Sequence, residues 1–277
     1  FAGTRLARRT AAMLGIDPRR SLPRVAKKTF TRRFPELPQG AGPAEVALFN
    51  DTWNEYQRPE VGEGAVRLFA AAGARIHLPE VVCCGRPMLS EGLVDEARKN
   101  AGRNLDLLMP LVERDVPLVG LEPSCILTLR NDYRKLLPDD ERVEKLARAT
   151  RLFEEAMLEL DGELPLREGV PVLLHGHCHQ KALVGTGPTE RVLGLAADVE
   201  VVDSGCCGMA GLFGYEKGHY EVSMKMGERR LFPAVRDAGE RVVVAPGTSC
   251  REQILDGTER RALHPAEYLA SLLDRST

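Results

Sequence analysis

Short apolar runs alternate along the chain with longer stretches in which apolar residues recur at helical spacing. In the first half this pattern predicts strands at 45–49, 74–78 and 116–121, and helices at 60–72, at about 89–114 and from about 126 and 140. The second half predicts strands at 170–174, 199–202 and 241–245, with helices at 189–196 and 216–238. Strands that alternate with helices are typical of parallel sheets covered by helices, so we expect an α/β fold.

The triplet Cys-Cys-Gly occurs twice, at 83–85 and at 206–208, each time after the second predicted strand of its half. A cysteine preceded by serine follows the third strand in both halves, at Cys125 and Cys250. This is an internal duplication, and we expect two similar repeats at 45–166 and 167–277. Each repeat would be a small parallel sheet flanked by helices. Loops at the carboxyl ends of parallel strands converge, so the cysteines should gather there.

Residues 1–44 form a basic arm, in which 4–14 is predicted to be a short amphipathic helix. We expect the arm to be a linker that packs on a neighbouring domain. A phosphate-binding or membrane-surface patch is the alternative, but it lacks interleaved aromatic residues. The first residue is Phe1, so we expect the chain to start inside a longer polypeptide.

The composition excludes several classes of protein. The net charge of −2 gives no nucleic-acid signature, no apolar run is long enough for a membrane span, and there is no secretory signal. Seven cysteines, an odd number without C-x-x-C spacing, do not suit a disulfide scaffold, a zinc ribbon or a thioredoxin motif. We therefore expect reduced thiols in the cytoplasm, with peripheral attachment at the inner face of the membrane as an option.

In the second half, four thiols follow different strands and could meet at one site: Cys178, Cys206, Cys207 and Cys250. Zinc is the simplest centre for four thiolates. Adjacent cysteines are awkward ligands for one small ion, because neighbouring side chains of an extended chain point in opposite directions. A centre with several metal atoms removes this difficulty, and Gly205 and Gly208 let the backbone wrap around it. An iron–sulfur cluster is therefore the better interpretation.

The stretches VVCCGRPMLSEGLVDEAR, LLHGHCHQKA and DSGCCGMAGLFGYEKGHYEVSMKMGE carry a resemblance over nearly the whole chain. The duplicated pattern resembles the cysteine-rich CCG domain family, to which one of the subunits of heterodisulfide reductase belongs. It is most similar to the C-terminal iron–sulfur part of FAD-linked D-2-hydroxyacid dehydrogenases, the D-lactate type.

This resemblance implies electron transfer from flavin through a cluster, [4Fe-4S] in type, to a downstream acceptor. It implies oxidation of D-lactate, glycolate or 2-hydroxyglutarate by an enzyme of which this chain is one part. FAD is expected only on a portion outside this chain, so the chain should hold no catalytic residue of its own. The expected partners are the FAD-containing dehydrogenase domain and a ferredoxin-like cluster domain of the same protein or complex.

The chain departs from the family pattern in its first repeat. Asp51 stands where an early cysteine is expected, and Glu122 where the family can offer another. Three thiols remain there, Cys83, Cys84 and Cys125, which could hold zinc or be architectural. Two other functions stay open for the whole chain: a zinc-stabilised interaction module that docks on the flavin domain, and thiol–disulfide catalysis at the vicinal cysteines.

Other polar residues lie beside the cysteine motifs. His175, His177 and His179 alternate around Cys178 and would share one face of an extended backbone, where they could ligate metal, support the ligands or relay protons. Three cations could balance an anionic cluster or form ordinary salt bridges: Arg86, Lys181 and Arg251. His219 could reach the site but is expected to be structural. No dinucleotide-binding or P-loop motif is present.

Overall fold

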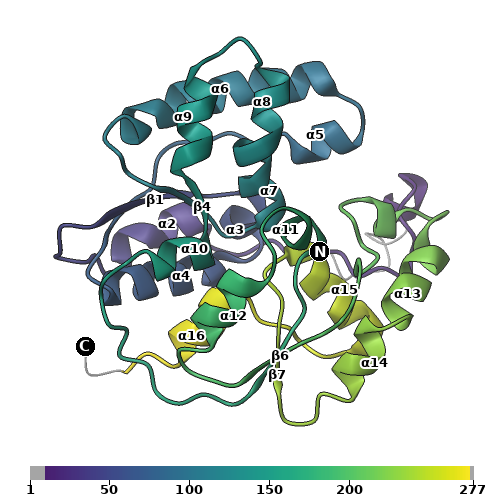
Figure 1. Ribbon diagram of the computed structural model, residues 1–277. Helices are drawn as coiled ribbons and strands as arrows, with labels where there is room; N and C mark the ends of the chain where they lie inside the picture. The colour runs from purple at the N-terminus through teal and green to yellow at the C-terminus, as the bar shows by residue number, and fades with distance from the viewer. Residues whose placement is uncertain (1–9, 275–277) are drawn as a thin grey trace.

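In the computed structural model, which describes residues 10–274, the strands form two parallel sheets (Figure 1). The first sheet has the order β2-β1-β3-β4 and contains Glu45–Phe49 (β1), Arg75–His77 (β2), Leu118–Gly120 (β3) and Thr150–Leu152 (β4). The second has the order β6-β5-β7 and contains Val172–Leu174 (β5), Val199–Val201 (β6) and Val242–Val244 (β7). In both sheets the first strand of the repeat lies between its second and third strands. The predicted duplication of a small parallel sheet is thus confirmed, and β4 is an addition that the sequence pattern did not predict.

The helices of the first repeat connect and cover its strands. They are Thr52–Tyr56 (α3), Pro59–Ala71 (α4), Arg86–Ser90 (α5), Val94–Val112 (α6), Pro123–Leu127 (α7), Tyr133–Leu136 (α8), Arg142–Ala149 (α9) and Phe153–Leu158 (α10). The single helix predicted at about 89–114 is divided into α5 and α6. Gly92 lies at this break with φ of 76°, a left-handed conformation that ends a helix.

The helices of the second repeat follow the same plan. They are Cys178–Leu183 (α11), Gly187–Leu193 (α12), Tyr220–Glu228 (α13), Leu231–Arg236 (α14), Thr248–Thr258 (α15) and Pro265–Ser271 (α16). The helix predicted at 216–238 is divided into α13 and α14, and Pro233 lies in the first turn of α14. Proline lacks an N–H donor and is tolerated at a helix start but not in its interior, which explains the break.

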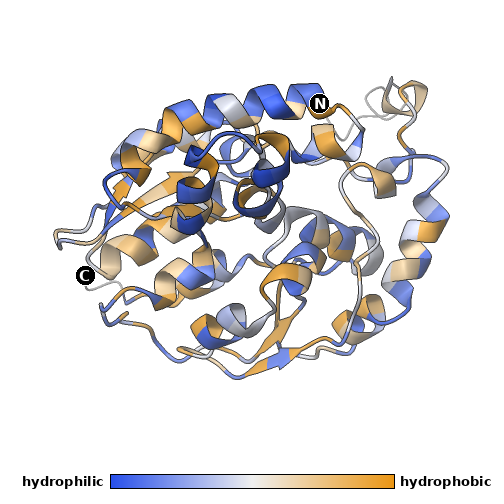
Figure 2. Ribbon diagram, turned by 45° about the horizontal axis from the view of Figure 1, so that its top comes forward, coloured by the Kyte–Doolittle hydropathy of each residue, from blue (hydrophilic) through white to orange (hydrophobic). Residues whose placement is uncertain are grey.

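A layer of helices lies between the two sheets. One hydrophobic cluster joins residues of β1 and β5 with residues of α4, α10, α12 and α16, and these helices occupy the centre of Figure 1. A second cluster packs α6 and α9 on the outer side of the first sheet, and a third packs α14 and α15 on the second. Figure 2 colours the strands mainly as hydrophobic, as expected for parallel sheets that are buried on both faces.

The last helix of the chain packs against the first repeat. Helix α16 lies on α4, and a Cβ at Gly64 would stand 2.7 Å from the carbonyl oxygen of Ala266. Glycine therefore allows the two helices to approach closely. This contact ties the end of the second repeat to the body of the first.

The basic arm packs on both repeats. Residues 10–13 are helical, and the rest of the helix predicted at 4–14 lies outside the described residues. Phe30, in helix Phe30–Arg33 (α2), is buried against α4, and a Cβ at Gly62 would stand 2.6 Å from its ring. Arg20 is buried within the second repeat. Among the described residues, no helix combines the length and the apolar character needed to cross a bilayer.

Candidate metal centre

All seven cysteines lie beyond the carboxyl ends of strands, as predicted. Cys83 and Cys84 follow β2, and Cys125 lies in α7 after β3. In the second repeat Cys178 opens α11 after β5, the pair Cys206 and Cys207 follows β6, and Cys250 lies in α15 after β7. Because β5 is the central strand of its sheet, the loops after β6 and β7 flank the one after β5.

The four thiols of the second repeat lie in a continuous series of neighbours. Cys206 interacts with Cys178 and with Cys207, and Cys207 interacts with Cys250. A ring nitrogen of His175 and the sulfurs of Cys207 and Cys250 lie within 4.8 Å of one another, and all three residues are buried. The fold therefore collects the four second-repeat thiols that sequence spacing suggested, and it adds His175.

Hydrogen bonds between the four thiols shift their pKa values in opposite directions. Hydrogen bonds from Cys178 and then from Cys207 lower the pKa of Cys206 to about 2. The pKa values of Cys178 and Cys207 are raised, in both cases first by their hydrogen bond to Cys206. The pKa of Cys250 lies well below its usual range, first because of its hydrogen bond with Cys207, although burial opposes this shift. A metal cation can displace the remaining protons from thiols that lie side by side in this way.

In both Cys-Cys-Gly loops the glycine has a positive φ and a backbone N–H donates to a cysteine sulfur, to the first cysteine in the second repeat and to the second cysteine in the first repeat. Gly208 has φ of 98° and donates its N–H to Cys206 Sγ at 3.3 Å. Gly85 has φ of 91°, and the next residue, Arg86, donates its N–H to Cys84 Sγ at 3.4 Å. The glycine supplies the left-handed turn that brings backbone donors onto a cysteine sulfur.

Of the three histidines around Cys178, His175 lies at the thiols. Its Nδ1 is 2.8 Å from Ser204 Oγ, while its buried Nε2 has no hydrogen-bond partner among the described residues. His177 faces the first repeat, with its Nε2 3.4 Å from Ser124 Oγ. His179 does not continue the extended backbone that was expected, because α11 begins at Cys178, and its ring centroid lies 6.5 Å from that of His177. His219 stacks on Phe213, with ring centroids 4.2 Å apart.

The three cations hold the loops that carry the cysteines. Lys181 donates to the carbonyl oxygens of Ser204 and Gly205, just before the vicinal pair. Arg251 is buried and donates to the carbonyl oxygens of Ala245 and Pro246 at 2.9 and 2.6 Å. Arg86 binds Thr128 Oγ1 at 2.9 Å and pairs with Asp132. The three cations thus bind backbone and hydroxyl oxygens and a carboxylate, and in this way they fix the loops that carry the cysteines.

In the first repeat, Cys84 is the neighbour of both Cys83 and Cys125. Cys84 lowers the pKa of Cys125 by a hydrogen bond, but burial and the charges of Asp51 and Glu122 outweigh this effect and raise it to about 11. Asp51 caps α3 by accepting the N–H groups of Trp53 and Asn54 at 2.9 and 3.1 Å. The carboxylate that stands in place of a cysteine is therefore used by a helix terminus.

Glu122 joins the two repeats. One carboxylate oxygen accepts the Ser124 hydroxyl at 2.7 Å within α7, and the other accepts the Thr248 N–H at 2.7 Å at the start of α15. It thus caps two helices, one carrying Cys125 and the other Cys250. Sequence reasoning found Glu122 only as a departure from the family pattern, because nothing in the local sequence indicates a partner in the other repeat.

Comparison with known proteins agrees with this architecture. A family model described as a cysteine-rich domain, CCG, matches residues 46–130 and 172–255. The chain is 31% identical over 271 residues to a subunit of the anaerobic glycerol-3-phosphate dehydrogenase of Escherichia coli K12, covering 95% of this chain and 68% of that subunit. It is 30% identical over 246 residues to the D-2-hydroxyglutarate dehydrogenase of Pseudomonas putida, covering 87% of this chain but 24% of the enzyme. Lactate utilization protein A of Bacillus subtilis is 24% identical over 244 residues, which are 82% of this chain and 99% of that protein.

Proposed function

Because the chain belongs to the cysteine-rich CCG domain family, we propose that it is an iron–sulfur electron-transfer domain of an FAD-linked oxidoreductase. Its proposed ligands are Cys178, Cys206, Cys207 and Cys250. The observation that carries the proposal is the convergence of these four thiols, from three separate loops, next to the buried imidazole of His175, which also interacts with Cys250.

The donor set fits an iron–sulfur centre. Thiolates are the ligands that such clusters use, and the sulfurs here already lie in mutual contact at strand ends. The adjacent residues Cys206 and Cys207 both belong to the series, which suits a centre in which different thiolates bind different iron atoms. We propose the [4Fe-4S] type. The imidazole of His175, which interacts with Cys250, could bind a metal atom or donate to a ligand sulfur.

The residues around the thiols would keep the centre in place and in a low-dielectric environment. When bound, the cluster supplies a one-electron redox centre. Gly208 offers a backbone N–H to Cys206, and Lys181 fixes the loop that precedes it. Cys207 and Cys250 are 3% and 1% exposed, so the deeper side of the site excludes water. N–H donors and burial around sulfur are the means by which a protein sets a cluster potential.

The electron donor and the substrate follow from the family. We propose that electrons come from a flavoprotein domain or subunit and leave to a downstream acceptor, with a ferredoxin-like cluster domain as a further partner. The substrate class proposed for the whole enzyme is a D-2-hydroxy acid, such as D-lactate, glycolate or 2-hydroxyglutarate. FAD would bind the partner rather than this chain. The proposed location is the cytoplasm, or the inner face of the membrane by peripheral attachment.

A zinc-stabilised interaction module is the second candidate. His175, Cys207 and Cys250 place their ligand atoms within 4.8 Å of one another, which also suits a single tetrahedral ion. In the first repeat, Cys83, Cys84 and Cys125 are proposed as a possible additional zinc site. Thiol–disulfide catalysis at the vicinal cysteine pairs would need neither iron nor zinc.

Metal analysis of the anaerobically purified protein tests these functions. Broad visible absorption with iron and acid-labile sulfide supports the cluster, a colourless protein with zinc supports the interaction module, and a metal-free protein that reduces disulfides supports thiol chemistry. Cys207→Ser should lose the iron and sulfide, because a harder oxygen replaces a thiolate in a soft site. Cys84→Ser changes the equivalent residue of the first repeat and should keep them. Full iron and sulfide in Cys207→Ser would overturn the assignment of the four ligands.

A further inference from the structure

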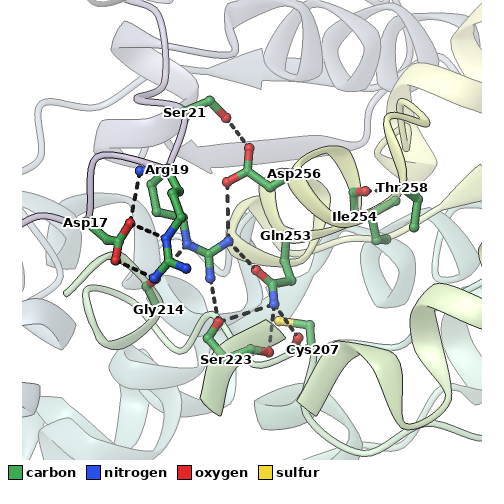
Figure 3. A network of polar contacts seen from close by, with 11 residues as sticks. Asp17, Arg19, Ser21, Cys207, Gly214, Ser223, Gln253, Ile254, Asp256 and Thr258 are labelled. Atoms are coloured by element: carbon green, nitrogen blue, oxygen red, sulfur yellow. Dashed lines mark hydrogen bonds and ion pairs between the residues drawn. The ribbon is translucent and has the colours of Figure 1, made fainter. Parts of the chain in front are cut away.

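Arg20, in the basic arm, is a buried charge within the second repeat. Arg20 is 1% exposed, although in sequence it lies far before the second repeat. Its guanidinium donates to the carbonyl oxygen of Gly214 at 2.6 Å, to Ser223 Oγ at 2.6 Å and to Gln253 Oε1 at 2.7 Å (Figure 3). It also forms an ion pair with Asp256 at 3.2 Å and lies 4.8 Å from the centroid of the Tyr220 ring. A buried guanidinium with this many partners is fixed in one geometry.

Gln253 connects this arginine to a proposed ligand. The Gln253 side chain is fully buried in α15, and its Nε2 donates to the carbonyl oxygens of Cys207 and Ser223, both at 3.0 Å. Figure 3 shows the nitrogen of the Gln253 amide toward Cys207, and the oxygen of the same amide accepts from Arg20. Arg20 therefore determines which way the amide points, and the amide holds the backbone of Cys207.

The arm also holds the chain that follows the vicinal cysteines. The Asp17 N–H donates to the Tyr215 carbonyl at 2.7 Å, and the Lys217 N–H donates to the Gly15 carbonyl at 3.0 Å. The guanidinium of Arg19 lies 3.7 Å from the centroid of the Tyr220 ring. Residues 15–20 thus fasten the irregular segment between Gly208 and α13, which has little regular secondary structure of its own.

We propose that Arg20 is a positioning residue for the electron-transfer site, acting through Gln253 on the Cys207 loop. This inference rests on the proposed function, since it concerns the loop that would bind the cluster. Arg20 has two effects that can be separated. Its hydrogen bonds hold the loop closed, and its buried positive charge favours the more negative, reduced form of the centre.

The test compares three variants of the full chain. Arg20→Met removes both effects, Arg20→Lys keeps the charge and loses the forked hydrogen bonds, and Gln253→Glu keeps an acceptor for Arg20 but removes the donor to Cys207. Arg24→Gln is the matched control, because Arg24 is an exposed arginine of the same arm outside residues 15–20. The readouts are the midpoint potential of the centre and the rate at which iodoacetamide alkylates individual cysteines in the purified protein.

In Arg20→Met we expect a lower midpoint potential and alkylation of Cys207 that is faster by about tenfold or more, since local opening no longer has to break these hydrogen bonds. Cys84, the equally buried cysteine of the first repeat, should not change. Arg20→Lys should keep the midpoint potential near that of the unmodified protein but should still show faster alkylation of Cys207. Gln253→Glu should also show faster alkylation of Cys207. Arg24→Gln should behave as the unmodified protein.

Unchanged potential and unchanged alkylation in Arg20→Met would overturn the inference. A parallel rise at Cys84 and Cys207 would overturn it as well, because Arg20 would then support only the fold. If Arg20→Met does not fold, Gln253→Glu and Arg20→Lys decide the question by the same readouts. A protein without iron would contradict the proposed function alone, since the alkylation comparison still decides whether Arg20 positions the Cys207 loop.

Discussion

Glu122 Oε2 accepts the backbone N–H of Thr248 at 2.7 Å, so a carboxylate of the first repeat caps a helix of the second. The same side chain accepts the Ser124 hydroxyl at the start of its own helix α7. Since α7 carries Cys125 and α15 carries Cys250, one buried residue fixes both cysteine-bearing helices relative to each other. The two repeats are therefore joined at the site itself as well as through their shared core.

Replacement of Glu122 should weaken the fold measurably. Glu122→Ala removes both caps and leaves the Thr248 N–H without its partner, so we expect a loss of about 2 kcal/mol in the free energy of unfolding. Glu122→Gln keeps one acceptor oxygen and should lose less. Denaturant unfolding measures both, with the exposed Glu113→Ala as control. An unfolding curve of Glu122→Ala that matches the control would contradict this role.

We expect the first repeat to be mainly architectural. The triple Ser variant of Cys83, Cys84 and Cys125 should keep the visible absorption of the centre, while the triple Ser variant of Cys206, Cys207 and Cys250 should lose it. Stability should fall only modestly in the first variant, by about 1 to 3 kcal/mol, because a hydroxyl replaces the buried thiol of Cys84. Loss of the absorption with unchanged circular dichroism would instead show a redox centre in the first repeat.

The two glycines of the Cys-Cys-Gly triplets should differ in their tolerance of alanine. Both have positive φ, so each alanine variant loses about 1 to 2 kcal/mol of stability from the left-handed conformation. At Gly208 a Cβ would also clash with the carbonyl oxygen of Ser223, whereas at Gly85 the nearest atom would be 3.4 Å away. Thermal unfolding should rank Gly208→Ala as the more destabilised variant. Gly205→Ala, with no neighbour within 4 Å, serves as control. Equal losses at 85 and 208 would contradict the predicted steric difference.

Glu154 should make the protein less stable as the pH rises. Burial raises its pKa from 4.5 to about 7, and its Oε1 has no hydrogen-bond partner among the described residues. Because the folded protein binds this proton more tightly than the unfolded chain, the stabilisation is complete below pH 4.5 and is lost as the pH rises through about 7. The stabilisation that this proton contributes is at most about 3 kcal/mol.

Glu154→Gln removes this titration. The free energy of unfolding of the variant should therefore fall less between pH 5 and pH 8, by about 1 to 3 kcal/mol, than that of the unmodified protein. Chemical denaturation at several pH values measures the difference, with Glu168→Gln as an exposed control. An identical pH dependence in both variants would show that Glu154 is not protonated in the folded state.

The sequence by itself determined the repeat architecture and the positions of the cysteines. Strand and helix periodicities are local, so the apolar runs at 45–49, 116–121 and 170–174 could be recognised without knowledge of their neighbours. Parallel pairing then placed the residues after each strand at one edge of the sheet. These two facts explain why the thiols of the second repeat, from Cys178 to Cys250, lie next to one another.

The tertiary structure decided which other residues reach that edge. The partners of Arg20 lie about 200 residues later in the chain, and Thr248 lies 126 residues after Glu122. Contacts at such separations leave no periodic signal, because they depend on how the sheets and their helices pack. Which of the three histidines reaches the thiols depended likewise on packing, because His175 lies at Ser204 and the thiols whereas His177 faces Ser124 of the first repeat.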